Sequence, residues 1–200
     1  MSRRALYLAT LLVLTLPVQP AIAETGRSVV LVLDASGSMN AQLTGGTTRI
    51  DAAKDAMASL VGKLAEDSRL AFRGYGPLSP TSKKDCQDSE LVVGFDTVAN
   101  NKAPVLEKKD GIRAQGYTPI NLSLQLAAKD LSSEESAERV VLLVSDGKET
   151  CEGDPCATAK ALADKLVVHT IGFGVDTVTR QATPMHRQRC PWQLFRCGRR

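Results

Sequence analysis

Histidine is scarce in this chain, and aromatic side chains make up only 4% of it. The two histidines are His169, inside an expected strand over Val167–Phe173, and His186, near the C-terminus. Nucleophilic catalysis needs a base beside the nucleophile, and a histidine within a strand is typically structural. No acid–base pair can be identified, so we expect no catalytic residues and disfavour an enzyme.

A long hydrophobic run is also lacking. The longest, Ala5–Leu16, has roughly a dozen residues, short of the ~20 that span a bilayer. Two arginines precede this run, and the triplet Ala-Ile-Ala follows it. This pattern predicts a signal peptide over residues 1–23, with cleavage before Glu24. No cysteine follows the run to carry a lipid, so we expect no stable membrane anchor after cleavage and an exported, periplasmic or extracellular protein.

An excess of one charge is missing as well. The net charge is +3, from 25 basic and 22 acidic residues. Without the two leader arginines and the five arginines after residue 181, 18 basic residues face 22 acidic ones. The body of the chain is therefore mildly acidic and offers no basic face interleaved with aromatic residues, which excludes nucleic acid as a partner.

What the chain does contain is an apolar run, Ser28–Leu33, that ends in Asp34-Ala-Ser36-Gly-Ser38. A continuous Val/Leu run is typical of a buried parallel strand. Ligands of open α/β sheets lie just beyond the carboxyl ends of the strands. Carboxylate and hydroxyl oxygens suit a hard divalent cation, although a polar turn after a strand would also explain this stretch taken alone.

Apolar runs alternate with helical stripes along the rest of the chain, which predicts an α/β fold with a doubly wound, mostly parallel sheet. We expect a helix capped by Thr48 or Thr47 and at most weak helicity over 98–112. A second helix is expected to begin with Thr118 as its cap and Pro119 as its first residue. The other expected elements are strands over Arg69–Tyr75, Glu90–Phe95, Arg139–Val144 and Val167–Phe173, and a helix over Asp154–Leu166.

Two further polar loops belong to the same edge of the predicted sheet. Thr118 lies in Gly-Tyr-Thr-Pro, and Asp146 follows a strongly apolar strand in Val-Ser-Asp-Gly. Helix capping would explain Thr118 by itself, and a Ser-Asp-Gly turn is common. Three loops with oxygen ligands on one edge instead predict one metal site.

These three motifs resemble the von Willebrand factor type A domain with its metal-ion-dependent adhesion site. The resemblance covers about residues 27–180, and Ser145–Cys151 is similar to secreted bacterial members. It implies strand order 3-2-1-4-5-6 with an antiparallel third strand at the edge. It also implies that a cation, Mg²⁺ or else Mn²⁺ or Ca²⁺, is bound by five side chains: Asp34, Ser36, Ser38, Thr118 and Asp146.

In that family an open position on the cation accepts a carboxylate from a protein partner. The resemblance thus implies a divalent-metal-dependent protein-binding module for adhesion or envelope assembly. The alternative is a metal-dependent hydrolase that uses the same Asp/Ser loop. The absence of an identifiable base favours binding.

The five cysteines are Cys86, Cys151, Cys156, Cys190 and Cys197. Disulfides are expected in an exported chain, and we expect at least one among the first three, without a pairing that spacing could assign. A zinc site at Cys151 and Cys156 would lack two further spaced ligands.

Residues 181–200 form an irregular basic tail with no acidic residue and no apolar periodicity. A basic arm is one interpretation; we favour a frameshift. Met and Trp each have a single codon. When the codons of Met185-His186 are read one base forward they must encode Cys, and those of Trp192-Gln193 must encode Gly. A helix and a strand start are compatible with the shifted frame. The present chain would then lack the last helix and strand of its domain, expose the strand Val167–Phe173, and carry a disordered tail beyond Arg180.

The nucleotide sequence tests this interpretation. We expect codons that allow the shifted frame to encode an amphipathic helix followed by a strand, with one cysteine in place of Cys190 and Cys197. Codons that interrupt that frame after residue 181 would show that the tail is native.

Overall fold

The computed structural model describes residues 26–147 and 149–173 and is built around its first strand, β1 (Arg27–Asp34). Every residue of β1 after Arg27 is buried. Val29, Leu31 and Leu33 pack into one core cluster, and Val30 and Val32 pack into another on the opposite face. An uninterrupted apolar strand is needed here because both faces of the sheet are covered.

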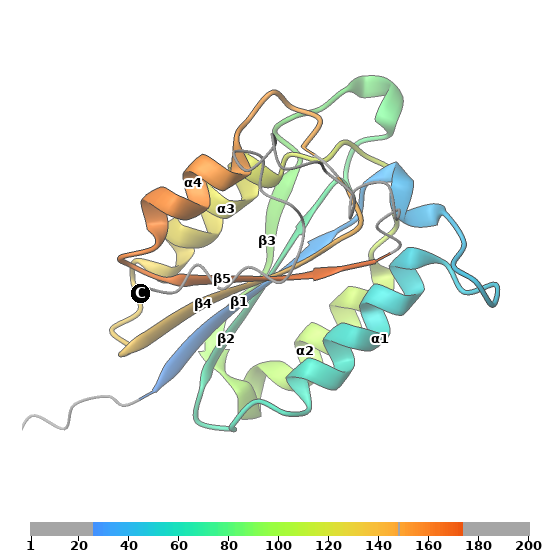
Figure 1. Cartoon of the computed structure of the whole chain (residues 1–200). Helices are drawn as coiled ribbons and strands as arrows, with labels where there is room; N and C mark the ends of the chain where they lie inside the picture. Colours follow the sequence, from blue (N-terminus) through green and yellow to red (C-terminus); the bar gives the residue numbers. More distant parts are fainter. Residues whose placement is uncertain (1–25, 148, 174–200) are drawn as a thin grey trace, which may run out of the picture.

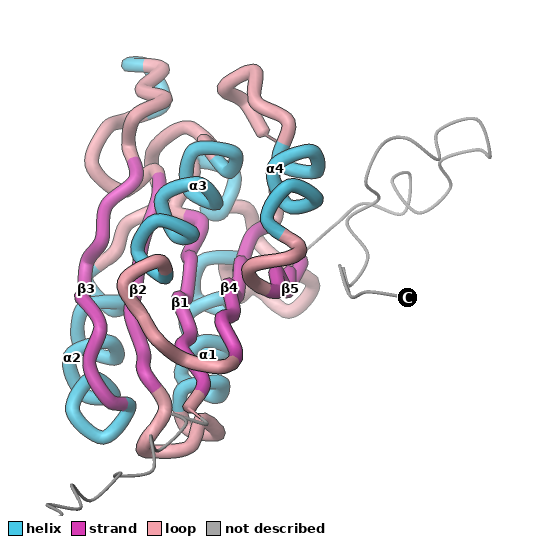
Figure 2. Tube along the Cα trace, turned by 90° about the vertical axis from the view of Figure 1, so that its left-hand side faces the viewer, coloured by secondary structure: helices cyan, strands magenta, loops and turns pink. Residues whose placement is uncertain are grey.

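The sheet has five strands in the order β3-β2-β1-β4-β5 (Figure 2). β2, β1, β4 and β5 run parallel, and β3 pairs with β2 in the antiparallel direction at one edge. The bounds are β2 Arg69–Tyr75, β3 Ser89–Thr97, β4 Glu138–Ser145 and β5 Val167–Gly172. The predicted α/β class, the strand order through β5 and the antiparallel edge strand are confirmed.

Helices cover both faces of the sheet in three layers (Figure 1). α1 (Arg49–Val61) and α2 (Val98–Gly111) lie on one face, and α3 (Ile120–Leu131) and α4 (Pro155–Leu162) lie on the other. Two short 3₁₀ turns, Gly37–Asn40 and Thr81–Lys83, lie in the loops beyond β1 and β2. Across the described ranges no helix has the length and apolarity to cross a bilayer.

Two predicted helix boundaries can be compared with the structure. Thr48 caps α1, as expected, and its hydroxyl accepts a hydrogen bond from the Asp51 amide. α4 ends at Leu162 rather than Leu166, because a turn after Leu162 leads directly into β5. The expected signal peptide (1–23) and the basic tail (181–200) lie outside the described residues.

The weak helicity expected over 98–112 is wrong, because α2 is a helix of 14 residues. Thr97 caps its N-terminus by accepting a hydrogen bond from the Asn100 amide. Pro104 lies within the helix on its exposed face. Tertiary packing stabilises α2, because Val98 and Val105 are buried against the sheet.

Asn101 joins α2 to a register irregularity between β2 and β3. Its buried amide donates to the carbonyl oxygens of Leu70 at 2.7 Å and Gly94 at 2.6 Å. A buried polar side chain on a helix with few apolar residues therefore fastens the antiparallel edge of the sheet.

We expect Asn101→Ala to lower the free energy of unfolding by about 2 kcal/mol, because the buried Leu70 carbonyl and the partly buried Gly94 carbonyl lose their donor. Chemical denaturation measures the loss. Asn100→Ala is the matched control, because Asn100 is exposed on the same helix, and it should cost less than half as much. Equal losses in the two variants would contradict this role of Asn101.

Candidate functional site

The loop after β1 positions the first predicted site residues through backbone geometry. Asp34 is fully buried, and its Oδ1 accepts a 2.8 Å hydrogen bond from the Ser36 amide. The Gly37 amide donates to the Gly116 carbonyl at 2.9 Å, which fastens this loop to the one that precedes α3. Ser36 and Ser38 therefore present their hydroxyls on the same side, 3.0 Å apart.

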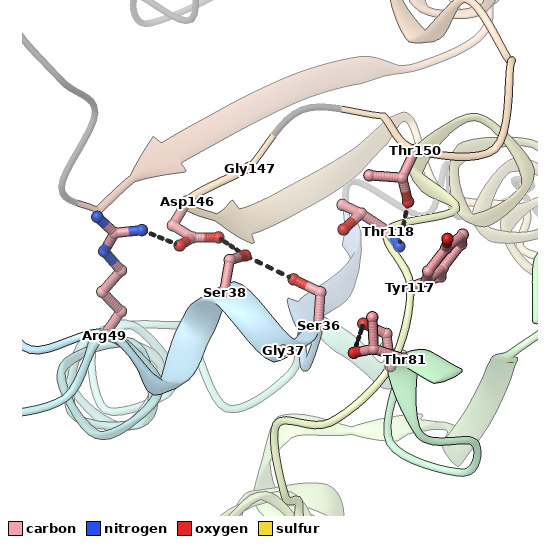
Figure 3. A pocket seen from close by; sticks show the side chains of 11 residues that line it. Ser36, Gly37, Ser38, Arg49, Thr81, Tyr117, Thr118, Asp146, Gly147 and Thr150 are labelled. Carbon is pink, nitrogen blue, oxygen red and sulfur yellow. Dashed lines mark hydrogen bonds and ion pairs between the residues drawn. The ribbon is translucent and has the colours of Figure 1, made fainter. Parts of the chain in front are cut away.

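The loop after β4 meets these serines from the neighbouring strand. The Ser38 hydroxyl donates to Asp146 Oδ1 at 2.8 Å, so Ser36, Ser38 and Asp146 form a continuous chain of oxygens (Figure 3). The Asp146 carboxylate is fully buried. The parallel pairing of β1 with β4 causes this meeting, because it brings the ends of both strands to one edge.

Gly147 shows how closely the three loops converge. A Cβ atom placed on Gly147 would lie 3.6 Å from Thr118 Cγ2, 3.7 Å from Asp34 Oδ2 and 3.7 Å from Ser38 Oγ. One point in space is thus within about 4 Å of a residue from each loop. An open pocket of about 440 Å³ lies here and is lined by Ser36, Gly37, Ser38, Arg49, Thr81, Gly116, Tyr117, Thr118, Asp146, Gly147 and Thr150 (Figure 3).

Buried hydroxyls beneath the pocket hold Asp34 in place. The Ser145 hydroxyl donates to Asp34 Oδ2 at 2.6 Å and accepts from the Tyr75 hydroxyl at 3.1 Å. Burial raises the pKa of Asp34, an effect opposed by the hydrogen bonds from Ser145 and Ser36 and reinforced by the charge of Asp146. Burial and the charge of Asp34 raise the pKa of Tyr75 well above its ordinary value, which keeps Tyr75 a donor.

Thr118 reaches the site, but not as the helix cap that its sequence context suggested. α3 begins at Ile120, and the residue before it, Pro119, makes no side-chain cap. The loop after β4 holds Thr118 instead: the Thr118 amide donates to Thr150 Oγ1 at 2.9 Å, and the Thr150 amide donates to the Thr118 carbonyl at 3.2 Å. Held in this way, Thr118 lines the pocket beside Ser36 and Asp146.

Glu149 and Thr150 are site-supporting residues that the sequence reasoning missed. The Glu149 carboxylate accepts from the Asn121 amide at 2.6 Å, which provides the cap that α3 lacks locally, and from the Cys151 amide at 2.8 Å. A signal was present, since both residues lie in the Ser-Asp-Gly-x-Glu-Thr-Cys segment on which the resemblance rests. The Thr118 and Asn121 amides that they accept from lie about 30 residues earlier, at positions that spacing does not indicate.

The expected disulfide joins Cys86 to Cys151. It ties the loop between β2 and β3 to the loop that carries Asp146 and Thr150. The zinc alternative is wrong, because Cys151 is used in this bridge and Cys156 is also disulfide-bonded.

Arg49 also belongs to the site, and no sequence motif pointed to it. It is the first residue of α1, and its Nη1 donates to Asp146 Oδ2 in a close ion pair (Figure 3). A lone arginine at the start of a helix carries no signal of its own. Only the packing of α1 beside β4 brings its guanidinium to Asp146.

The donor set of the site consists of oxygen atoms, as a hard divalent cation requires. The cluster contains two carboxylates, Asp34 and Asp146, and three hydroxyls, and the charge of Asp146 raises the pKa of Asp34 because the two acids are close. Within the described ranges no group of three or more His, Cys, Asp or Glu side chains is placed to hold a metal. The oxygen donors gathered here are the hydroxyls of Ser36, Ser38 and Thr118 and the carboxylates of Asp34 and Asp146, which are donors of the kind that a hard cation takes.

The three-layer fold with polar loops on the carboxyl edge of its sheet defines a doubly wound α/β domain. The family model described as the von Willebrand factor type A domain matches residues 29–149. The chain belongs to this family.

Similar proteins agree with this assignment. An uncharacterised protein of Bacillus subtilis, YwmC, is 31% identical over 157 residues, which are 76% of this chain and 68% of that protein. BatB from Bacteroides thetaiotaomicron has a similar fold, with a TM-score of 0.59 and 24% identity over 74% of this chain and 66% of that chain. A von Willebrand factor type A structure from Catenulispora acidiphila gives a TM-score of 0.63 at 20% identity, over 76% of this chain and 34% of that one.

Opening the Cys86–Cys151 bridge should lower the free energy of unfolding by about 4 kcal/mol, because 65 residues separate its ends and the unfolded chain regains the entropy of that loop. Denaturation of Cys86→Ser, Cys151→Ser and the double variant without reductant measures this. Each single variant should lose as much as the double variant, since each opens the same loop. A loss below 1 kcal/mol, or additive losses, would contradict it.

Proposed function

We propose that this domain binds a divalent cation, Mg²⁺ or else Mn²⁺ or Ca²⁺, and uses it to bind an acidic side chain of a partner protein. The proposed ligands are Asp34, Ser36, Ser38, Thr118 and Asp146. The observation that carries the proposal is the convergence of three loops around Gly147, where Thr118, Asp34 and Ser38 each lie within 4 Å of one point.

The chemistry of the donors supports this function. Hydroxyl ligands carry no net charge, so a cation held mainly by hydroxyls would retain its attraction for an anionic group from outside. Ser38 is exposed at the pocket, whereas the Asp34 and Asp146 carboxylates are buried behind it. A partner carboxylate would therefore approach through the pocket, and the buried acids would balance the charge from the opposite side.

Binding is favoured over the hydrolase alternative by the hydrogen bonds of the candidate nucleophiles. The Ser36 and Ser38 hydroxyls bond to each other, and Ser38 donates to Asp146. Asp146 in turn is held in an ion pair with Arg49, so both of its oxygens already accept from donors. The arrangement stabilises a set of oxygens and activates none of them.

Export to the periplasm or the cell exterior forms part of the proposal. It is supported by the leader expected over residues 1–23 and by the Cys86–Cys151 disulfide, because structural disulfides form and persist in oxidising compartments.

A thermal-shift titration with Mn²⁺ or Mg²⁺, reversed by EDTA, tests the cation site. A free cation concentration 100 times the dissociation constant should stabilise the protein by about 2.7 kcal/mol. Ser38→Ala removes an exposed ligand and Asp34→Ala a buried one, and both should abolish the shift. Ser59→Ala, an exposed serine on α1, should retain it in full.

The partner is sought in the same preparation. Pull-down from envelope proteins should recover an acidic partner with Mg²⁺ present and lose it with EDTA or with Ser38→Ala. A wild-type protein whose stability and partner binding ignore both cation and EDTA would refute the proposed function.

A further inference from the structure

We propose that Arg49 is a specificity-determining residue of this site: it weakens cation binding and strengthens the binding of an acidic ligand to the cation-loaded domain. The inference rests on the proposed function and assigns a role to a residue outside the five proposed ligands. It follows from the ion pair with Asp146 and from the charges that the pocket gathers.

Both the backbone and the side chain of Arg49 are bonded to loops of the site. Its amide donates to the Ala41 carbonyl at 2.9 Å, which ties the start of α1 to the loop that carries Ser36 and Ser38. Its guanidinium pairs with Asp146 Oδ2, while Ser38 donates to Asp146 Oδ1. One carboxylate therefore connects the arginine directly to a proposed cation ligand (Figure 3).

The burial of the pair gives the interaction its strength. The Asp146 carboxylate is 0% exposed and the Arg49 side chain 21% exposed. A buried carboxylate without a counter-charge is strongly disfavoured, so Arg49 neutralises Asp146 in the cation-free domain. Because Arg49 also lines the pocket, its positive charge acts on whatever enters.

The charge count then gives opposite signs for two ligands. Asp34, Asp146 and Arg49 together carry −1; a divalent cation brings the site to +1, and one carboxylate brings it to zero. Without Arg49 the net charge of the site is −2 when empty, zero with the cation and −1 with the cation and the carboxylate. Arg49 therefore repels the cation, and it leaves the loaded site with a positive charge that a ligand carboxylate neutralises.

Arg49→Gln tests the proposal, with Mn²⁺ as the first probe and acetate at saturating Mn²⁺ as the second. The guanidinium repels a doubly charged ion and attracts a singly charged carboxylate, so even in a water-like dielectric Coulomb's law leads us to expect a cation Kd at least about tenfold lower in the variant and an acetate Kd at least about threefold higher. Titration calorimetry measures the first, and loss of Mn²⁺-induced water-proton relaxation measures the second. Structural damage would weaken both interactions, so opposite shifts identify the charge effect.

Two further variants serve as controls. Arg49→Lys keeps the charge and should keep both constants within about threefold of wild type. Lys63→Gln removes an exposed charge just beyond the far end of α1 and should leave both constants unchanged. High ionic strength should reduce the difference between Arg49→Gln and wild type.

The outcomes separate this proposal from the one on which it rests. Wild type that binds Mn²⁺ with an affinity unchanged in Arg49→Gln, or equally changed in Lys63→Gln, overturns the role of Arg49 and leaves the cation site standing. Binding by Arg49→Gln alone supports the role of Arg49 and refutes cation binding by the native domain. Binding by neither protein overturns both.

Discussion

The hydrogen bond from Ser145 to Asp34 joins the ends of β1 and β4, and the arrangement of the site depends on it. Asp34 is buried at the end of the central strand, where a carboxylate is tolerated only with donors around it. Its two oxygens are satisfied by the Ser36 amide and the Ser145 hydroxyl. The first bond shapes the serine loop, and the second fixes the strand end that leads into Asp146. The buried Tyr75 hydroxyl donates to Ser145, so the residues that hold Asp34 are themselves buried and hydrogen-bonded.

The loops around these residues are fixed by contacts with one another rather than by their own propensities. Thr150 holds the backbone of Thr118, Glu149 caps α3, and the Cys86–Cys151 bridge ties down the segment that carries both. Little conformational entropy remains to be lost at these positions when a ligand binds, which favours binding by a preorganised site. The exposed hydroxyl of Ser38 is then presented by a rigid frame.

Positive and negative charges are distributed unevenly around the site. The two carboxylates are buried, the hydroxyls face the pocket, and Arg49 stands beside Asp146. Negative charge therefore lies behind the oxygens that a cation would meet, and positive charge lies beside them. This polarity suits the recruitment of an anionic group from outside better than proton transfer within the site, because the acids are already occupied by donors.

The sequence by itself determined the α/β class and the buried β1 and pointed to the five candidate ligands. These depend on local information: strand runs, polar residues at strand ends and the spacing of Asp34, Ser36 and Ser38. The order of the strands through β5 followed from the family resemblance that these motifs carry. Tertiary structure alone decided that 98–111 is helical, that Thr118 is held by Thr150 rather than capping α3, that Cys86 pairs with Cys151, and that Arg49 meets Asp146. These features depend on contacts between residues about 30 to about 100 positions apart. Burial and packing at such contacts override local propensity, so no pattern within a single segment predicts them.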